Sequence, residues 1–267
     1  MIPKQILVIY MKPRFKIEEE TLNLVIETLK GYKLKFIKHE RTKDYRDIIK
    51  NIDLIIVIGG DGTFLLSSQF VKNIPMLGVN SNPERKEGFL MQTTKYDFKK
   101  KFSDFLRNKH KIVKITRLQP VLNGKKLRPA LNEVFVGHVK SYKMIRYKLT
   151  INNKEELQRS SGIIISTPIG SHAWALSARG KKMTLLSKKY QYVVREPYQG
   201  KLHSHKLLKG IISGKDILVI NAQMNHGIIS IDALSEDFEF KKGSILKIVP
   251  CPDPLNYVVF SDFNERK

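Results

Sequence analysis

A buried strand that runs into a glycine-rich turn constrains this chain more than any other feature. Residues 54–63 read Leu-Ile-Ile-Val-Ile-Gly-Gly-Asp-Gly-Thr. The unbroken apolar, mostly β-branched run is typical of a strand that is covered on both faces in a parallel sheet. The three glycines allow a sharp turn in which backbone N–H groups are open to an anionic ligand. The segment therefore predicts an α/β domain with a phosphate-accepting turn.

Asp61 is the one carboxylate in this turn. A carboxylate repels a phosphate unless it binds Mg²⁺ or takes a proton from an attacking hydroxyl, so its presence points to phosphoryl transfer. The alternative is an ordinary strand-to-helix turn in which Asp61 or Thr63 caps the next helix. The turn is neither a Walker A loop nor a Gly-x-Gly-x-x-Gly fingerprint, so alone it names no substrate.

Composition limits the function classes. The 267 residues are 42% hydrophobic, and no apolar run reaches the roughly 18 residues that span a membrane. The N-terminus reads as a first strand, and Cys251 is the only cysteine, so we expect a cytoplasmic protein without disulfides or membrane contact. The net charge of +23 is spread over short, scattered lysine runs, which favours solvated surfaces over nucleic-acid binding.

The first 110 residues alternate strand-like and helix-like patterns. Leu22, Val25, Ile26 and Leu29, for example, have the spacing of an amphipathic helix. Such a series predicts a Rossmann-like parallel sheet, in which ligands bind at the carboxyl ends of the strands. The predicted strands are 6–10, 33–37, 54–58 and 76–79, and the predicted helices are 18–30, about 44–50, 63–69 and 97–109.

From about residue 111 short alternating segments dominate, separated by turns such as Asn123-Gly124. The predicted fold is therefore an α/β Rossmann-like N-terminal domain (1–110) plus an all-β sandwich-like C-terminal domain (111–267). The C-terminal tail is a candidate to pack back on the first domain. The predicted strands of the second domain are 111–117, 118–122, 144–151, 162–166, 217–221, 228–231 and 245–249.

Four further segments accompany the glycine turn. They read Gly-Val-Asn-Ser-Asn-Pro-Glu-Arg-Lys-Glu-Gly-Phe-Leu over 78–90, Leu-Asn-Glu-Val-Phe-Val-Gly over 131–137, Ser-Thr-Pro-Ile-Gly-Ser-His-Ala-Trp-Ala-Leu-Ser over 166–177, and Arg-Glu-Pro over 195–197. In this order and at these distances they resemble the NAD kinase family over about residues 50–267. Their residue patterns are closest to those of the mitochondrial-type branch of that family.

The resemblance implies an ATP-dependent kinase that phosphorylates the adenosine ribose 2′-hydroxyl of NAD to give NADP. Asp61 would be the catalytic residue, and with Gly62 it would also contact NAD. Gly60, Gly62 and Thr63 would bring backbone N–H groups and a hydroxyl to the ATP phosphates. Mg²⁺ or another divalent cation would be held mainly by the phosphates, with Asp61 as a candidate ligand and no firm protein ligand. Positioning and charge neutralisation would supply most of the rate.

Other residues match the family's dinucleotide pocket. Asn132 and Glu133 would bind ribose hydroxyls, although the pair read alone is an exposed strand end. Trp174 would stack on or wall off a ring, the alternative being a core tryptophan. Arg85 either reaches an ATP phosphate or forms an ion pair with Glu87, and both readings stay open. The remaining residues of the predicted NAD pocket are Thr167, Ser171, His172, Ala173 and Ser177.

The chain departs from the family pattern at several positions. His172 stands where the commoner bacterial type has threonine, and Arg179 stands where many members have glycine. The late strand ends in Asp232-Ala233, where Asp-Gly is common. The roles of these residues are open, as are those of His203 and His205.

Two other functions compete with NAD kinase. One is a lipid kinase of the diacylglycerol or sphingoid type, which shares a related glycine loop; Asn132-Glu133 and the segment 170–174 favour NAD instead. The other is a non-catalytic basic nucleotide-binding protein, against which the presence of Asp61 argues. The resemblance also implies a homo-oligomer, a dimer or a tetramer. The sequence fixes neither this number, nor the choice between NAD and NADH, nor the phosphate donor.

Overall fold

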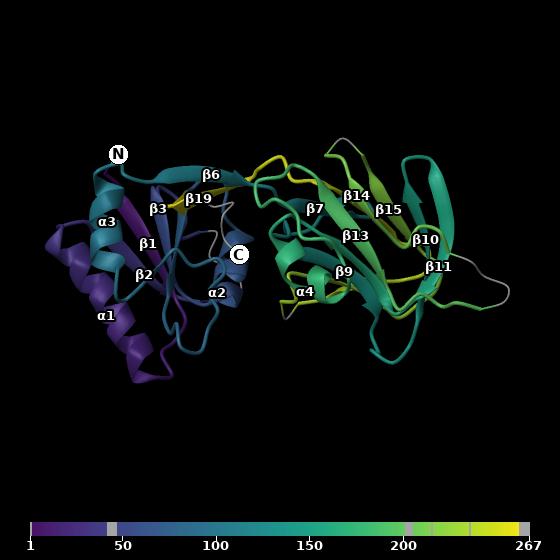
Figure 1. The fold of residues 1–267 in the computed structure, drawn as a ribbon, viewed down its shortest axis with the longest axis horizontal. Coiled ribbons are helices and arrows are strands. Elements are labelled where there is room, and N and C mark those ends of the chain that lie inside the picture. Colours follow the sequence, from purple (N-terminus) through teal and green to yellow (C-terminus); the bar gives the residue numbers. More distant parts are fainter. Residues whose placement is uncertain (1, 42–46, 201–204, 215, 235, 262–267) are drawn as a thin grey trace. The chain divides into compact units, whose positions relative to one another are not determined.

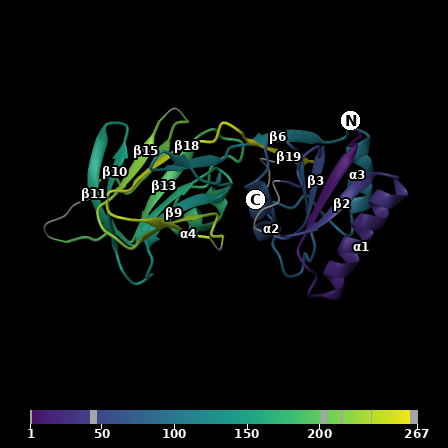
Figure 2. The ribbon, with the colours of Figure 1, turned by 180° about the vertical axis from the view of Figure 1, so that it is seen from behind.

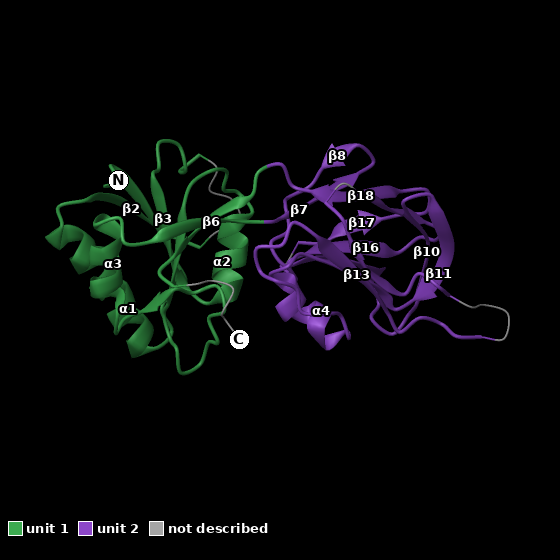
Figure 3. Cartoon of the chain, turned by 45° about the horizontal axis from the view of Figure 1, so that its top comes forward, with its two compact units in different colours: residues 1–115, 253–267 green, residues 116–252 purple. Residues whose placement is uncertain are grey.

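A computed structural model describes residues 2–41, 47–200, 205–214, 216–234 and 236–261 (Figure 1). The chain divides into two compact units, coloured separately in Figure 3. The first comprises residues 1–115 and 253–267, and the second comprises residues 116–252. The chain therefore returns to its first unit after completing the second.

The first unit is built on one mostly parallel sheet. Its strands are β1 (Gln5–Tyr10), β2 (Lys35–Glu40), β3 (Leu54–Gly59), β4 (Met76–Asn80), β5 (Thr93–Thr94), β6 (Lys111–Ile115) and β19 (Leu255–Val259). They lie in the order β2-β1-β3-β4-β19-β6, with β5 paired to β4. Only β6 is antiparallel to its neighbour, β19. Strand β3 is buried along its whole length, as its unbroken apolar run predicts.

Helices cover both faces of this sheet (Figures 1 and 2). They are α1 (Lys16–Gly31), α2 (Asp61–Ser68) and α3 (Phe98–Leu106). Val25 and Leu29 of α1 and Phe102 of α3 belong to one core cluster against β1, β3 and β4. Phe64 of α2 packs edge-on against Tyr257 of β19, with ring centroids 5.5 Å apart. Strand-like and helix-like segments alternate along the first 110 residues because helices cover both apolar faces of the sheet.

The segment after β4 is fixed by side chains on both sides. The Asn80 amide nitrogen donates to the carbonyl of Lys86 over 2.8 Å. The hydroxyl of Tyr257 donates to the carbonyl of Leu90 over 2.7 Å and accepts from the amide of Gln92 over 2.7 Å. These bonds tie residues 80–92 to β4 and β19, so the loop beside the glycine turn has a defined position.

The second unit is a sandwich of two six-stranded antiparallel sheets. One sheet has the order β11-β10-β15-β18-β7-β8 and the other the order β14-β13-β12-β9-β16-β17. Val134 and Ile163 of the second sheet and Tyr147 and Leu246 of the first share one buried core. The elements are β7 (Leu118–Leu122), β8 (Lys125–Lys126), β9 (Glu133–His138), β10 (Ile145–Ile151), β11 (Lys154–Ser160), β12 (Gly162–Ser166), η1 (Gly170–His172), α4 (Trp174–Ser177), β13 (Tyr190–Arg195), β14 (Lys209–Ile212), β15 (Leu218–Ala222), β16 (Gly227–Ile231), β17 (Phe238–Phe240) and β18 (Ile245–Pro250).

The predicted fold class, α/β followed by an all-β sandwich, is confirmed. Several elements differ from the sequence prediction. Lys111–Ile115, expected to open the second domain, is an edge strand of the first sheet. The helix expected at about 44–50 begins outside the described residues, and residues 47–50 form turns. The strands that were not predicted are β5, β8, β11, β13, β14, β17 and β19. Among them, β11 is largely polar and β13 has no strict alternation.

None of the helices in the described parts of the chain is long and apolar enough to cross a membrane.

Gly78 tests the close packing that holds the loop after β4. A Cβ at this position would lie 2.5 Å from the Leu90 carbonyl oxygen and 2.8 Å from the Met91 sulfur. We expect Gly78→Ala to lower the free energy of unfolding by about 1–3 kcal/mol, because the loop must shift. Gly31→Ala is the matched control, since nothing lies within 4 Å of its Cβ position at the end of α1. Urea denaturation followed by circular dichroism measures both, and equal midpoints would contradict the packing argument.

Candidate functional site

The glycine turn forms the junction between β3 and α2 in the first unit. Gly60 is the N-cap of α2, with φ −126° and ψ −175°, and Asp61 is the first helical residue. Gly62 is exposed, and no atom lies within 4 Å of the position that its Cβ would occupy. The first N–H groups of a helix have no partner inside the helix, so this turn offers donors to an anion.

Asp61 links the turn to the loop after β4. Its carboxylate accepts the backbone N–H of Leu90 over 2.7 Å and that of Phe89 over 3.1 Å. One carboxylate can accept about four hydrogen bonds, so these two fix its orientation and leave acceptor positions for a ligand. The side chain predicted to be catalytic is therefore held in place by the backbone.

A cavity of about 370 Å³ opens over the turn. It is lined by residues 60–63 together with Met11, Arg41, Lys86 and Glu87. The predicted phosphate-contacting residues Gly60, Gly62 and Thr63 are thus brought together with Asp61. Sequence reasoning missed Lys86 and Arg41, because neither stands in a position that the motif singles out.

The side chains of two residues predicted to bind phosphate, Thr63 and Arg85, make their contacts elsewhere. The hydroxyl of Thr63 packs behind the turn, and Thr63 is 2% exposed. A Cβ at Gly59 would lie 2.7 Å from that hydroxyl oxygen. Arg85 lies outside the cavity with its guanidinium over the Phe15 ring, 4.6 Å from the centroid. Within the described residues Arg85 forms no ion pair with Glu87.

In the second unit a carboxylate fastens the Asn132-Glu133 segment. Asp232 is buried and accepts the backbone N–H groups of Leu131, Asn132 and Glu133 at 3.0, 2.7 and 3.2 Å. Its own N–H donates to the Glu133 carbonyl over 2.9 Å. The start of β9 is therefore locked to the end of β16, and the half-buried Asn132 is held at that junction.

Glu133 is buried beside this clamp, with 3% of its surface exposed. Its Oε2 atom has no hydrogen-bond partner among the described residues. Burial, and then the charge of Asp232, raise the pKa of Glu133 to about 8. At neutral pH Glu133 therefore holds a proton and is both a donor and an acceptor.

The turn after β12 is built from hydroxyls that bind the backbone. Thr167 donates to the Leu131 carbonyl over 2.5 Å and accepts the Gly170 N–H over 3.0 Å. Ser171 donates to the Pro168 carbonyl over 2.6 Å and accepts the Met183 N–H over 2.9 Å. Gly170 is required here, because a Cβ would lie 2.0 Å from the carbonyl oxygen of Asn132. Thr167 and Ser171 thus position the segment that follows.

Trp174 begins α4, which packs against the sheet that contains β9 and β12. Its ring is 4.8 Å from the Phe135 ring, and the Arg195 guanidinium lies over it at 5.1 Å. His172 places Nε2 3.0 Å from the Met183 carbonyl oxygen. Trp174 and His172 are partly buried, while the remaining predicted pocket residues, Ala173 and Ser177, are exposed.

The two positions where glycine is common in the family keep a glycine-like backbone. Arg179 has φ 65°, and Ala233 has φ 50° next to Asp232 at φ 56°. This left-handed region favours glycine, so both turns are formed despite their side chains. His203 lies outside the described residues. His205 places Nδ1 3.6 Å from the carboxylate of Glu156.

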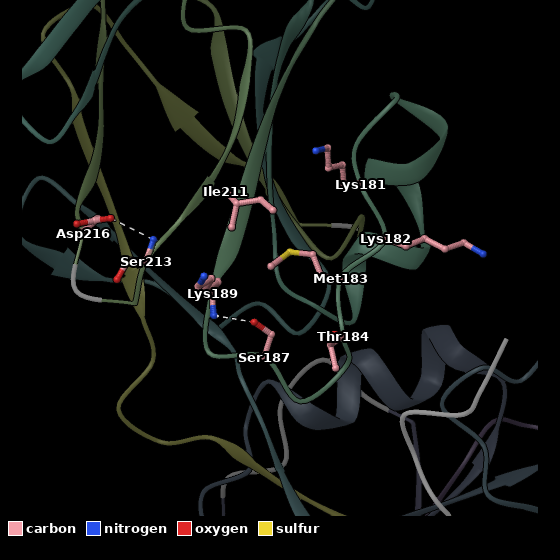
Figure 4. A pocket seen from close by; sticks show the side chains of 9 residues that line it. All are labelled: Lys181, Lys182, Met183, Thr184, Ser187, Lys189, Ile211, Ser213 and Asp216. Carbon is pink, nitrogen blue, oxygen red and sulfur yellow. Dashed lines mark hydrogen bonds between the residues drawn. The ribbon is translucent and has the colours of Figure 1, made fainter.

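A further cavity, of about 520 Å³, lies beside the turn after β12 (Figure 4). Met183, whose backbone binds Ser171 and His172, forms part of its wall. Lysines 181, 182 and 189 also line it, and Figure 4 shows the side chains of the first two extending in different directions. Because the ammonium groups do not converge, the cavity does not define an anion site by itself.

The described residues contain no group of three or more His, Cys, Asp or Glu side chains that could hold a metal ion. The cavity over the glycine turn has two carboxylates in its lining, those of Asp61 and Glu87. Mg²⁺ is commonly bound by one or two carboxylates together with substrate phosphates. This donor set fits a cation that is bound together with the phosphates.

The raised pKa of Glu133 predicts that the free energy of unfolding depends on pH. Its pKa is higher in the folded protein than the ordinary 4.5, so its contribution is full below about pH 4.5 and is lost as pH rises through about 8. Glu133→Gln keeps the neutral form, so its free energy of unfolding should gain about 2–4 kcal/mol on wild type between pH 5 and pH 8. Urea denaturation across this range measures the difference. The exposed Glu239→Gln should parallel wild type, and a parallel Glu133→Gln curve would contradict the assignment.

Two family models match the chain. The model of the ATP-NAD kinase N-terminal domain matches residues 5–110, and that of the ATP-NAD kinase C-terminal domain matches residues 131–260. The chain is similar to a probable NADH kinase of Oryza sativa subsp. japonica, with 32% identity over 79% of this chain and 72% of that protein. It is also similar to an NAD kinase of Methanopyrus kandleri, with 38% identity over 51% of this chain and 49% of that protein.

The crystal structure of an NAD kinase from Archaeoglobus fulgidus in complex with ATP has the same fold. The TM-score is 0.78 at 23% identity, over 98% of this chain and 94% of that one. The two family models together extend over most of the sequence and reach into both units. On this basis the chain belongs to the ATP-NAD kinase family, a family of ATP-dependent kinases.

Proposed function

We propose that the protein transfers the γ-phosphoryl group of ATP to the adenosine ribose 2′-hydroxyl of NAD or NADH, giving NADP or NADPH. The observation that carries this proposal is the junction of β3 and α2, where a fixed carboxylate and open backbone donors line one cavity. The NAD and NADH kinases among the relatives support the choice of acceptor, and the ATP complex of the Archaeoglobus fulgidus enzyme supports the choice of donor.

In this proposal the first unit binds the donor phosphates. The backbone N–H groups at Gly60 and Gly62 contact phosphate oxygens, and the start of α2 adds a favourable dipole. The Thr63 hydroxyl packs behind the turn and the Thr63 N–H donates to the Gly60 carbonyl over 3.0 Å, so the role of Thr63 is to shape the turn. Mg²⁺, when bound, offsets the phosphate charge, with Asp61 as the candidate protein ligand.

Asp61 orients the acceptor hydroxyl and takes its proton. Its two backbone hydrogen bonds hold the carboxylate in one orientation, so little ordering remains to be done when the substrate arrives. The bond from the hydroxyl oxygen to phosphorus forms as the bond to the departing ADP breaks. Catalysis of such a transfer rests mainly on positioning and charge stabilisation.

The second unit binds the dinucleotide in this proposal. Asn132 and protonated Glu133 present donors and acceptors to a ribose diol. Trp174, whose ring is tilted by 42° against that of Phe135, contacts a ring of the dinucleotide, and the exposed Ala173 and Ser177 allow close approach. His172 contributes to the same part of the dinucleotide site as Trp174.

The competing functions are not favoured. Both units match the ATP-NAD kinase domains, and the half-buried Asn132 beside the buried Glu133 suits a ribose diol. We also propose that the protein forms a homo-oligomer, either a dimer or a tetramer, and that it is located in the cytoplasm.

The direct test is turnover of purified protein with ATP and Mg²⁺. We expect NADP from NAD or NADPH from NADH, measured by a coupled NADP-dependent dehydrogenase and by mass spectrometry of the product. A panel of other nucleoside triphosphates and polyphosphate identifies the donor. Absence of product with both acceptors, together with phosphorylation of diacylglycerol or a sphingoid base, would overturn the proposal.

Asp61→Asn separates catalysis from structure. We expect turnover to fall at least about 100-fold, because the amide cannot accept the proton, while ATP affinity changes little. Asp53→Asn is the matched control, since Asp53 also accepts two backbone N–H groups, from Lys4 and Gln5 at 2.7 and 3.0 Å. Near wild-type turnover in Asp61→Asn, or an equal loss in both variants, would show that Asp61 has only a structural role.

A further inference from the structure

Lys86 is held by two partners next to the glycine turn. Its ammonium nitrogen lies 2.5 Å from Oε1 of Glu18 and 2.8 Å from the hydroxyl oxygen of Ser81. A lysine ammonium has three N–H donors, and these two contacts use two of them. One donor of Lys86 is therefore left for another acceptor.

The partners of Lys86 are themselves fixed. Glu18, in the first turn of α1, is 3% exposed and accepts the Arg14 N–H over 2.8 Å. Burial raises the pKa of Glu18, but the hydrogen bonds from Lys86 and the backbone, with the Lys86 charge, bring the pKa below its ordinary value. The hydroxyl of Thr21 donates to the Ser81 carbonyl over 3.1 Å, which joins α1 to the loop after β4.

The stem of Lys86 lies directly over the turn. A Cβ at Gly60 would be 3.1 Å from Cδ of Lys86, and Lys86 lines the cavity together with residues 60–63. Its backbone is bound on both sides, because its N–H donates to Asn82 and its carbonyl accepts from Asn80. With a side chain only 21% exposed, Lys86 is not a freely solvated surface lysine.

We propose that Lys86 is a further phosphate-binding residue of this site and that Glu18 is its positioning residue. The third N–H of the ammonium donates to a phosphate oxygen of the nucleotide that binds over Gly60. Glu18 and Ser81 hold the ammonium there in advance, so no side-chain ordering opposes binding. A charge-assisted hydrogen bond of this kind is stronger than a neutral one. The proposal deepens the proposed function, on which its biological meaning rests.

The chain contains a matched ion pair that lacks this role. Lys95 lies 2.6 Å from the carboxylate of Glu20, also on α1, and its side chain is 20% exposed. Lys95 is not among the residues that line the cavity. Lys95→Met therefore removes an equivalent ion pair and the same charge without touching the phosphate site.

Calorimetric titration with ATP·Mg²⁺ and, separately, with inorganic tripolyphosphate tests the proposal. We expect Lys86→Met to weaken both ligands about 10–100-fold and to leave NAD affinity unchanged. Glu18→Gln should weaken them about threefold, because the ammonium loses its orientation. Lys86→Arg should recover part of the loss, and Lys95→Met should bind as wild type does.

Folding is checked on the same samples by circular dichroism. If Lys86→Met leaves Glu18 unpaired and does not fold, the double variant Glu18→Gln/Lys86→Met removes both charges and takes its place. The double variant should lose affinity to the extent expected for Lys86→Met alone, because Glu18 acts only through Lys86. Unchanged tripolyphosphate affinity in the folded Lys86 variant, or an equal loss in Lys95→Met, overturns the proposal. Wild type that binds tripolyphosphate through Lys86 but makes no NADP speaks against the proposed function alone.

Discussion

The hydrogen bonds between the Asp61 carboxylate and the backbone of Phe89 and Leu90 are the contact on which the first site depends. They join the end of β3 to the loop after β4, two segments that the parallel sheet already brings to one edge. They add to the hydrogen bond from the Ser81 N–H to the Gly59 carbonyl, which spans 2.9 Å. One side chain therefore both fixes the loop after β4 and presents hydrogen-bond acceptors to the cavity. The carboxylate oxygens of Asp61 thus have a structural role and a proposed chemical role.

The second unit uses a carboxylate in a similar way. Asp232 binds three successive N–H groups at the start of β9, and its charge contributes to keeping the neighbouring Glu133 protonated. In both units a buried or half-buried aspartate binds successive backbone N–H groups. The two aspartates differ in surroundings, because Asp61 lines an open cavity whereas Asp232 is 3% exposed. This difference agrees with a chemical role for the first and a positioning role for the second.

Local pattern predicted much of the fold and the position of the turn. The apolar run of β3, the amphipathic spacing of α1 and the alternation in the sandwich strands follow from burial on two faces or one. The pairing of Lys86 with Glu18 was beyond such reasoning, because the two residues are 68 positions apart and no role was assigned to Lys86 within the segment 78–90. The polar strand β11 was missed for a related reason, since its place is set by hydrogen bonding to β10 rather than by its own pattern.

Strand β19 lies between β4 and β6 in the sheet of the first unit, although it is the last strand of the chain. During synthesis the ribosome therefore releases residues 116–252, a contiguous unit, before the first sheet has all of its strands. Strand β5 pairs with the end of β4, so the part of that edge at Met76 stays unpaired until Leu255–Val259 emerge. The sandwich can thus form from one contiguous stretch of chain, whereas the first sheet needs strands from both sides of that stretch.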